Sequence, residues 1–256
     1  MSDAILETVG LTKEFRGFVA VNDVNLSIRR GTIHGLIGPN GAGKTTCFNL
    51  LTKFLQPTRG TIRYDGRDIT GMKPAEVARL GLVRSFQISA VFPHLSVLEN
   101  VRVALQRTRG GSFDFWRSET LLRRFDDRAR ELLEDVGLSS YAALTAGELP
   151  YGRKRALEIA TTLALEPTMM LLDEPTAGMT HDDVGRIVSL IRRVSAGRTV
   201  LLVEHNLTVV SGLCDFITVL ARGSVLAEGD YATVARNPDV IAAYLGDEAS
   251  TEAAHG

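Results

Sequence analysis

Short, continuous apolar runs alternate with segments of helical periodicity over much of the chain. Two of these runs, at 169–172 and 199–203, have the length and composition of strands buried on both faces of a parallel sheet. Residues 33–37 are a further strand candidate. Helical patterns begin after Gly43 and occupy 184–194. This alternation of strands and helices predicts an α/β fold with a parallel sheet.

The N-terminal part of the chain has a different pattern. Short strand-like runs, broken by glycine and charged residues, lie at 4–6, 19–21 and 61–64. Asp65-Gly66 after the last of these runs is a hairpin signal, and Pro74 opens a short predicted helix that ends near residue 80. These features predict several short strands, one hairpin turn and a short helix in this part of the chain.

Helical periodicity dominates between residues 95 and 165, where β-branched runs become rare. One predicted helix, at 121–136, has an apolar face made of Leu121, Leu122, Phe125, Ala129, Leu132, Leu133 and Val136. Gly137 follows it as a predicted C-cap. The segment is therefore interpreted as a mostly helical insertion, whereas the small and polar residues 247–256 predict a flexible tail.

Composition restricts the possible functions. The chain has 256 residues and a formal net charge of −1, so it has no general basic field that would hold nucleic acid. Cys47 and Cys214 lack metal-binding spacing and are interpreted as reduced, buried thiols of a cytosolic protein. The N-terminus does not resemble a signal peptide, and no apolar run reaches the roughly 18 residues that span a bilayer. We therefore expect a soluble protein that reaches a membrane only through a partner.

A phosphate-binding motif follows the strand predicted at 33–37. Residues 38–45 read GPNGAGKT, which matches G-x-x-x-x-G-K-[ST] between a strand and a helix. The backbone amides of such a loop and of the following helix surround phosphates. Lys44 would pair with the β- and γ-phosphates, and the hydroxyl of Thr45 would bind Mg²⁺. A chance glycine-rich turn does not explain this context.

A second motif, MMLLDE at 169–174, ends a buried strand in two carboxylates. Neighbouring side chains on a strand point to opposite faces. Asp173 would therefore reach Mg²⁺ by way of water, while Glu174 would orient or deprotonate an attacking water. The two motifs together predict a P-loop nucleotide hydrolase, and at this point kinases, GTPases and ATPases all remain open.

The stretch AGELPYGRKRALEIA, at 146–160, places three basic residues before an amphipathic run. By itself it resembles either a nucleic-acid-binding helix or the start of a solvated helix. Because the net charge is near zero, we interpret Lys154 and Arg155 as part of a solvated helix face.

The order of the motifs resembles the ATP-binding cassette (ABC) family. That order is a phosphate loop, then Gln87, then a signature around Gly152, then the carboxylate pair, and finally His205 after a strand. The resemblance covers nearly the whole chain. It implies a RecA-like parallel-sheet core with an antiparallel β subdomain and an inserted helical subdomain at about 90–160, all within a single ATPase domain at 4–246.

The resemblance also implies the roles of individual residues. Phe15 would stack on adenine, with core packing as its alternative role and Phe18 as a weaker candidate for the same contact. Glu174 and His205 would be catalytic, His205 by contacting the γ-phosphate. The nucleotide-binding residues would be Phe15, Gly38, Pro39, Asn40, Gly41, Ala42, Gly43, Lys44, Thr45, Thr46 and Gln87. Mg²⁺ would be bound by Thr45, Gln87 and Asp173.

In this family the signature of one chain covers the ATP of a second chain. Here the signature consists of Leu149, Pro150, Tyr151, Gly152 and Arg153. Pro150 stands where a serine hydroxyl is usual, and Arg153 where glutamine is usual. We hypothesise that the free amides of Tyr151, Gly152 and Arg153 make most of the phosphate contact. Thr180 replaces a usual acidic or amide residue, which leaves the coupling between the two ATP sites open.

Within the family, Tyr151-Gly152 and the C-terminal segment from Asn237 are similar to ATP-binding subunits of branched-chain (hydrophobic) amino-acid importers. So is the segment 102–130, whose eight arginines against four acids suggest a solvated helical face or a contact with anionic headgroups. Cassettes for urea, amide or aromatic-acid import, lipopolysaccharide export cassettes and non-transport ABC ATPases remain alternatives.

The partners that the resemblance implies are a second ATP-binding subunit, as a homo- or heterodimer, two membrane permease subunits and, indirectly, an extracytoplasmic substrate-binding protein, with no nucleic acid. Phe92, Pro93 and Leu95 are candidates for permease contact, with ordinary packing as the alternative. The implied location is the cytoplasmic face of the plasma membrane.

Overall fold

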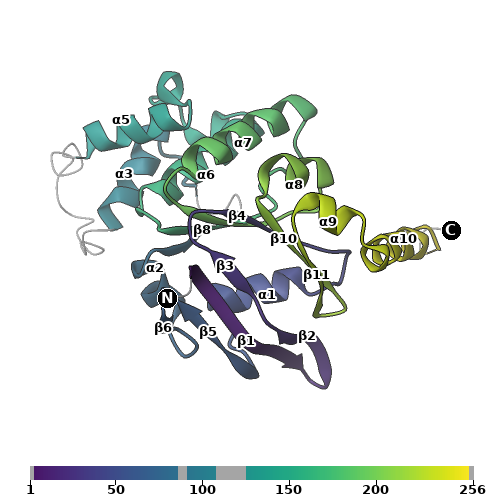
Figure 1. Cartoon of the computed structure of the whole chain (residues 1–256). Helices are drawn as coiled ribbons and strands as arrows, with labels where there is room; N and C mark the ends of the chain where they lie inside the picture. Colours follow the sequence, from purple (N-terminus) through teal and green to yellow (C-terminus); the bar gives the residue numbers. More distant parts are fainter. Residues whose placement is uncertain (1–2, 86–90, 108–124, 254–256) are drawn as a thin grey trace.

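A six-stranded sheet forms the centre of the molecule (Figure 1). The computed structural model describes residues 3–85, 91–107 and 125–253. The strand order is β11-β10-β4-β9-β8-β7, and all neighbours are parallel except the edge strand β11. The strands are β4 (Ile33–Ile37), β7 (Leu82–Arg84), β8 (Met169–Asp173), β9 (Thr199–Val203), β10 (Phe216–Ala221) and β11 (Ser224–Gly229). The predicted strands at 33–37, 169–172 and 199–203 are confirmed as β4, β8 and β9, in which every residue is buried.

Helices cover both faces of this sheet. Alternate residues of each strand point to opposite faces, so the apolar strands present side chains that must be buried on both sides. On one face, Leu171 and Leu201 pack in a core with Phe48 of α1 (Lys44–Leu51). On the other face, Leu172 and Leu202 belong to a core that includes the apolar side of α7 (His181–Val194). The smaller helices α2 (Pro74–Arg79), α8 (Leu207–Leu213) and α9 (Tyr231–Ala235) complete this part of the fold.

A second sheet, antiparallel, is built from the N-terminal strands in the order β2-β1-β5-β6, with β3 also paired to β1. Its strands are β1 (Ala4–Phe15), β2 (Phe18–Val24), β3 (Ser27–Arg29), β5 (Arg59–Tyr64) and β6 (Arg67–Asp68). Asp65 and Gly66 both have positive φ, 50° and 74°, between β5 and β6. The predicted hairpin is therefore confirmed, with a backbone that matches a type I′ turn.

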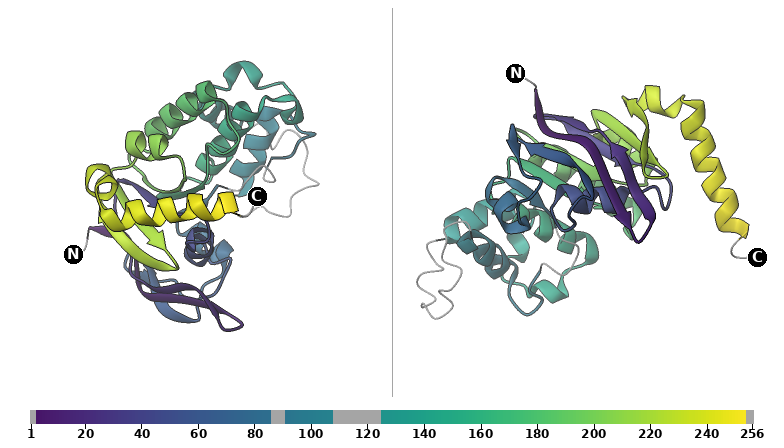
Figure 2. Two further views of the ribbon diagram at one scale, coloured as in Figure 1. Left: turned by 90° about the vertical axis from the view of Figure 1, so that its right-hand side faces the viewer. Right: turned by 90° about the horizontal axis from the view of Figure 1, so that it is seen from below.

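The helical layer lies away from the antiparallel sheet (Figures 1 and 2). It contains α3 (Val97–Arg107), α5 (Asp126–Asp135), the 3₁₀ turns Ser139–Tyr141 and Ala146–Glu148, and α6 (Tyr151–Leu163). The predicted apolar face of α5 is buried from Phe125 to Val136, and Gly137 ends the helix with a φ of 71°. Leu121 and Leu122 lie outside the described residues.

The C-terminal helix α10 (Pro238–Ala253) extends from the body of the protein (Figure 2). Residues 247–253, for which the sequence predicts a flexible tail, are thus helical, and 254–256 lie outside the described residues. Over the described ranges, no helix is long and apolar enough to cross a membrane. Cys47 and Cys214 are unpaired thiols, and burial raises the pKa of each to about 12.

Candidate functional site

The predicted phosphate loop connects the end of β4 to the start of α1. Its glycines Gly38, Gly41 and Gly43 have φ values of 149°, 73° and 96°. At Gly38 an added Cβ would lie 2.1 Å from the carbonyl oxygen of Leu220, and at Gly43 it would lie 2.5 Å from that of Ala20. These two glycines are therefore required because the loop passes directly against other backbone.

Lys44, the first residue of α1, lies inside this loop. Its Nζ donates hydrogen bonds to the carbonyls of Gly38 at 2.6 Å and Pro39 at 2.8 Å. The loop therefore curls around a buried ammonium group at the N-terminus of a helix, where the backbone amides also favour an anion. Thr45, Asn40 and Gly41 are exposed, whereas the side chain of Ala42 belongs to the core.

Asp173 ends β8 as a nearly buried carboxylate. Arg84 of the neighbouring strand β7 donates to its Oδ2 at 2.9 Å and to the Asn49 side chain of α1 at 2.6 Å. Burial raises the pKa of Asp173, with Arg84 opposing that shift and Glu174 adding to it. Arg84 therefore joins β7, α1 and the carboxylate, and it is a contact that sequence reasoning missed.

Glu174 and His205 are brought together although 31 positions separate them, because Asp173 of β8 pairs with Val203 of β9. Glu174 follows directly after the end of β8, and His205 lies two residues beyond the end of β9. The Nδ1 of His205 lies 3.7 Å from the Oε1 of Glu174, and both side chains are partly exposed. This places a carboxylate and an imidazole at the carboxyl edge of the sheet, where a general base and a phosphate-contacting group are expected.

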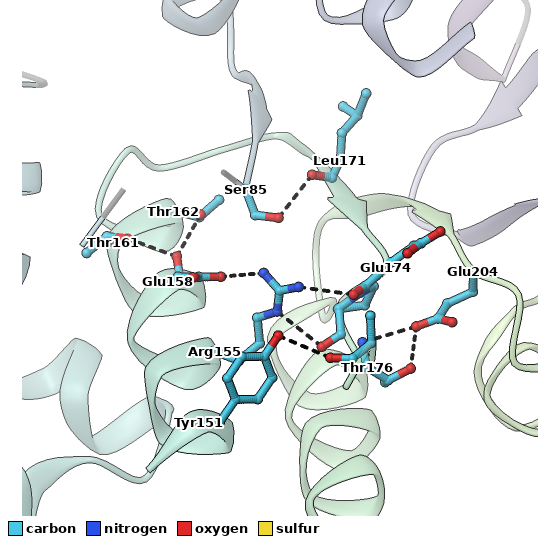
Figure 3. Close-up of polar contacts among 12 residues, drawn as sticks. Ser85, Tyr151, Arg155, Glu158, Thr161, Thr162, Leu171, Glu174, Thr176 and Glu204 are labelled. Carbon is cyan, nitrogen blue, oxygen red and sulfur yellow. Dashed lines mark hydrogen bonds and ion pairs between the residues drawn. The ribbon is translucent and has the colours of Figure 1, made fainter. Parts of the chain in front are cut away.

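Glu204, the residue before His205, is fully buried. Its Oε1 accepts from the amide and the hydroxyl of Thr176, at 3.1 Å and 2.5 Å. Its Oε2 accepts from the amides of His205 and Asn206, at 3.2 Å and 3.4 Å. One carboxylate therefore joins the turn after Glu174 to the turn that carries His205, and Figure 3 shows its contact with Thr176.

The groups that are present fit a magnesium ion. Mg²⁺ is typically bound by one or two carboxylates together with phosphate oxygens and water. Thr45 offers an exposed hydroxyl at the start of α1, and Asp173 offers a carboxylate that Arg84 orients. Gln87, the third predicted ligand, lies outside the described residues.

The two aromatic candidates lie at the tip of the β1–β2 hairpin, where Phe15 and Phe18 pair across the strands. Phe15 is 41% exposed and Phe18 is 68% exposed, so the alternative of core packing is wrong for Phe15. Lys13 Nζ lies 5.1 Å from the centroid of the Phe15 ring. Both rings are therefore surface features.

The signature opens α6. Leu149 is buried, Pro150 occupies the N-cap and Tyr151 begins the helix. The amide of Arg153 donates to the carbonyl of Pro150 at 2.9 Å, so the expectation that this amide is free is wrong. The reason is that α6 begins at Tyr151, which makes the third residue close a turn on the N-cap. The amides of Tyr151 and Gly152 remain the candidates for anion contact.

The signature also packs against other parts of the same chain. The Arg153 side chain donates to the carbonyl of Gly137 at 3.3 Å and stacks on Tyr141. A Cβ on Gly152 would lie 2.9 Å from the carboxylate of Asp183 in α7. Thr180 caps α7 by accepting a hydrogen bond from the Asp183 amide.

Arg155 is buried, so the expectation of a solvated face is wrong for this residue. Residues 155–160 of α6 are all buried, and Arg155 is neutralised there by Glu158 one turn later at 2.6 Å. Its guanidinium also donates to the carbonyls of Glu174 and Pro175 (Figure 3). Lys154 is half-buried. The sequence contains a signal for this burial, since Arg155 and Glu158 lie at i,i+3 spacing in an otherwise apolar run and can pair with each other.

The sequence matches two families of known proteins. The family described as "ABC transporter" matches residues 21–177, and that described as "Branched-chain amino acid ATP-binding cassette transporter" matches residues 224–250. The chain is 42% identical to the high-affinity branched-chain amino acid transport ATP-binding protein BraF of Pseudomonas aeruginosa, covering 96% of this chain and 100% of BraF. It is 41% identical to LivG of Escherichia coli, a protein of the same description, with the same coverage.

Solved structures with the same fold include nucleotide-bound forms. The ADP conformation of MJ1267, an ATP-binding cassette of an ABC transporter, superposes with a TM-score of 0.83 at 30% identity, over 95% of this chain and 99% of that one. A nucleotide-free cassette gives a TM-score of 0.82 at 31% identity, over 93% and 97%. The dimeric cassette MJ0796 bound to ADP and Pi gives 0.74 at 26% identity, over 88% and 98%.

Proposed function

The chain belongs to the ABC transporter family, and on that basis we propose that it is the ATP-hydrolysing subunit of an importer for branched-chain or other hydrophobic amino acids. The observation that carries the ATPase is the juxtaposition of the phosphate loop with Glu174 and His205 at the carboxyl edge of one sheet. The cargo is supported by relatives that match over their full length and by the match at 224–250.

The proposed chemistry follows from the positions of these groups. Lys44 and backbone amides of the phosphate loop and of the first turn of α1 bind the phosphates, and Glu174 orients the attacking water and accepts its proton. His205, next to Glu174, contacts the γ-phosphate. Thr45, Asp173 and Gln87 would hold Mg²⁺, which would supply positive charge to the phosphate oxygens.

We propose that two cassettes act together, as a homodimer or a heterodimer. The dimeric form of MJ0796 supports this arrangement. Each signature, from Leu149 to Arg153, would then cover the γ-phosphate held by the other chain. In this chain the contact would be made by the amides of Tyr151 and Gly152, because Pro150 has no hydroxyl and the Arg153 amide is already bonded.

The remaining proposed partners are two membrane permeases, which would hold the cassette at the cytoplasmic face of the membrane, and an extracytoplasmic binding protein that delivers substrate to them. Phe92 and Pro93 are exposed, whereas Leu95 is half-buried. Phe92 therefore fits a permease-contacting role better than ordinary packing does. We also propose that residues 4–246 act as one ATPase domain.

Transport is tested by reconstituting the chain with its cognate permeases and binding protein in vesicles and measuring uptake of radiolabelled leucine. We expect ATP-dependent uptake that disappears when Glu174 is replaced by Gln, since the motor step then fails. Vigorous ATP hydrolysis without leucine uptake, but with uptake of urea, an amide or an aromatic acid, would assign one of the alternative cargoes instead.

The role of Phe15 is tested by Phe15→Ala. We expect KM for ATP to rise about 5-fold or more with little change in kcat, because base–aromatic stacking contributes about 1–3 kcal/mol. Phe18→Ala removes a more exposed ring from the same hairpin and is the control. Equal KM values for the two variants would show that Phe15 has no special contact with the base.

A further inference from the structure

A buried arginine connects the signature helix to the main chain of the catalytic glutamate. Arg155 Nη2 donates to the carbonyl of Glu174 at 3.0 Å, and its Nε donates to that of Pro175 at 3.2 Å. Its Nη1 binds Glu158 Oε2 at 2.6 Å. Both charged side chains are almost completely buried, and Figure 3 shows them between α6 and the turn after β8. This fork uses the guanidinium geometry that a lysine cannot reproduce.

The backbone that Arg155 holds is an unusual one. Glu174 has a φ of 43°, in the left-handed region that residues with a side chain rarely adopt. Such conformations persist only where surrounding contacts determine them, and they cluster at functional sites. Here the Glu174 amide donates to the carbonyl of Val203 in β9, and its carbonyl accepts from Arg155 on the other side. The direction of the catalytic side chain thus depends on contacts of the peptide groups on both sides of Glu174.

We propose that Arg155 is a positioning residue, which fixes the Glu174 carboxylate for attack and connects it mechanically to the signature helix. Glu158 is the counter-ion that allows the guanidinium to be buried. Tyr151 reinforces the same connection, since its hydroxyl donates to the carbonyl of Ala177 at 3.1 Å. The first turns of α6 are therefore attached at two points to the segment that begins at Glu174.

This connection has a consequence for the paired sites. In the proposed dimer, on which this connection rests, α6 touches the ATP of one site while Glu174 of the same chain acts at the other. When the N-terminus of α6 binds the γ-phosphate held by the partner chain, Arg155 would then shift the Glu174 backbone and with it the direction of the Glu174 carboxylate. Arg155 would join the two active sites through one chain.

The test separates a positioning role from a role in stability. Arg155→Met leaves the Glu158 carboxylate buried without its partner, and Glu158 Oε1 already has no hydrogen-bond partner among the described residues. We expect this variant to lose both thermal stability and activity. In Arg155→Met/Glu158→Met both charges are replaced by apolar side chains, and the melting temperature is expected to recover. The matched control is Lys154→Met, which removes a neighbouring charge from the same helix.

The decisive measurement is kcat for MgATP hydrolysis by the full chain, together with KM and the Kd for a fluorescent ATP analogue. We expect the double variant to remain about 10- to 100-fold below wild type in kcat, with KM and Kd unchanged, because misplacement of a reacting group by about 1 Å costs that much. Lys154→Met is expected to retain wild-type kcat. A double variant whose kcat recovers together with its melting temperature would overturn the proposal.

If the double variant does not fold, Arg155→Lys answers the same question, since it keeps Glu158 paired but cannot reach both carbonyls. Wild-type kcat in Arg155→Lys would then overturn the proposal, and a reduced kcat at unchanged Kd would support it. The transport test is independent of this result. A chain that hydrolyses ATP normally but does not energise uptake overturns the cargo alone, and leaves the role of Arg155 intact.

Discussion

Replacing Glu174 by Gln is expected to lower kcat for ATP hydrolysis by about 100- to 10,000-fold, while the affinity for ATP changes little. The amide cannot accept the proton of the attacking water, but it has nearly the same shape as the carboxylate. The Glu174 side chain is 38% exposed, so the substitution should leave the stability of the fold almost unchanged. With hydrolysis blocked, the ATP-bound dimer should accumulate.

The chain offers a closely matched control in Glu166. That residue is also a glutamate with positive φ, 50°, and it is exposed on the segment that leads into β8, at the end of the strand remote from Glu174. Glu166→Gln should therefore hydrolyse ATP at the wild-type rate. Phosphate release under saturating MgATP gives kcat, and size-exclusion chromatography with ATP reports the dimer. Substantial hydrolysis by Glu174→Gln would assign the base to another group.

The parts of the fold that the sequence predicts well are those in which local pattern and tertiary packing agree. The runs that became β8 and β9 are almost entirely apolar because both faces of the sheet are covered, so pattern and burial carry the same information. The phosphate loop was equally clear, because its glycines and Lys44 are constrained by backbone geometry at fixed spacing. The Glu174–His205 pair followed from motif order, and strand register explains their proximity.

The rest depended on long-range contacts that carry no local signal. Arg155 looks like a surface residue until α6 is placed against the turn after β8, where the carbonyls of Glu174 and Pro175 and the carboxylate of Glu158 satisfy its donors. Glu204 likewise looks like a spacer before His205. Its burial is possible because amides and a hydroxyl from two separate turns converge on it. The availability of the Arg153 amide depended on where α6 begins, and helix ends are the least certain feature of any pattern.

The first glycine of the phosphate loop illustrates a long-range constraint with a large expected effect. Gly38→Ala should destabilise the protein by about 3 kcal/mol or more, through backbone strain together with overpacking. Its φ is 149°, and its Cβ would lie 2.1 Å from the carbonyl oxygen of Leu220 and 3.1 Å from the Cβ of Ala42. Leu220 cannot move away easily, because β10 is held between β4 and β11.

Gly41→Ala is the control within the same loop. Gly41 also has positive φ, 73°, but nothing lies within 4 Å of an added Cβ. Its expected cost is only the left-handed penalty of about 1–2 kcal/mol. Urea unfolding of both variants without nucleotide measures the difference directly, since the phosphate-binding role of the loop then makes no contribution. Equal unfolding midpoints would mean that β10 yields to the methyl group. A much lower urea midpoint for Gly38→Ala than for Gly41→Ala would show that Gly38 is required mainly because the loop packs closely against β10. The phosphate site would then be a consequence of that packing.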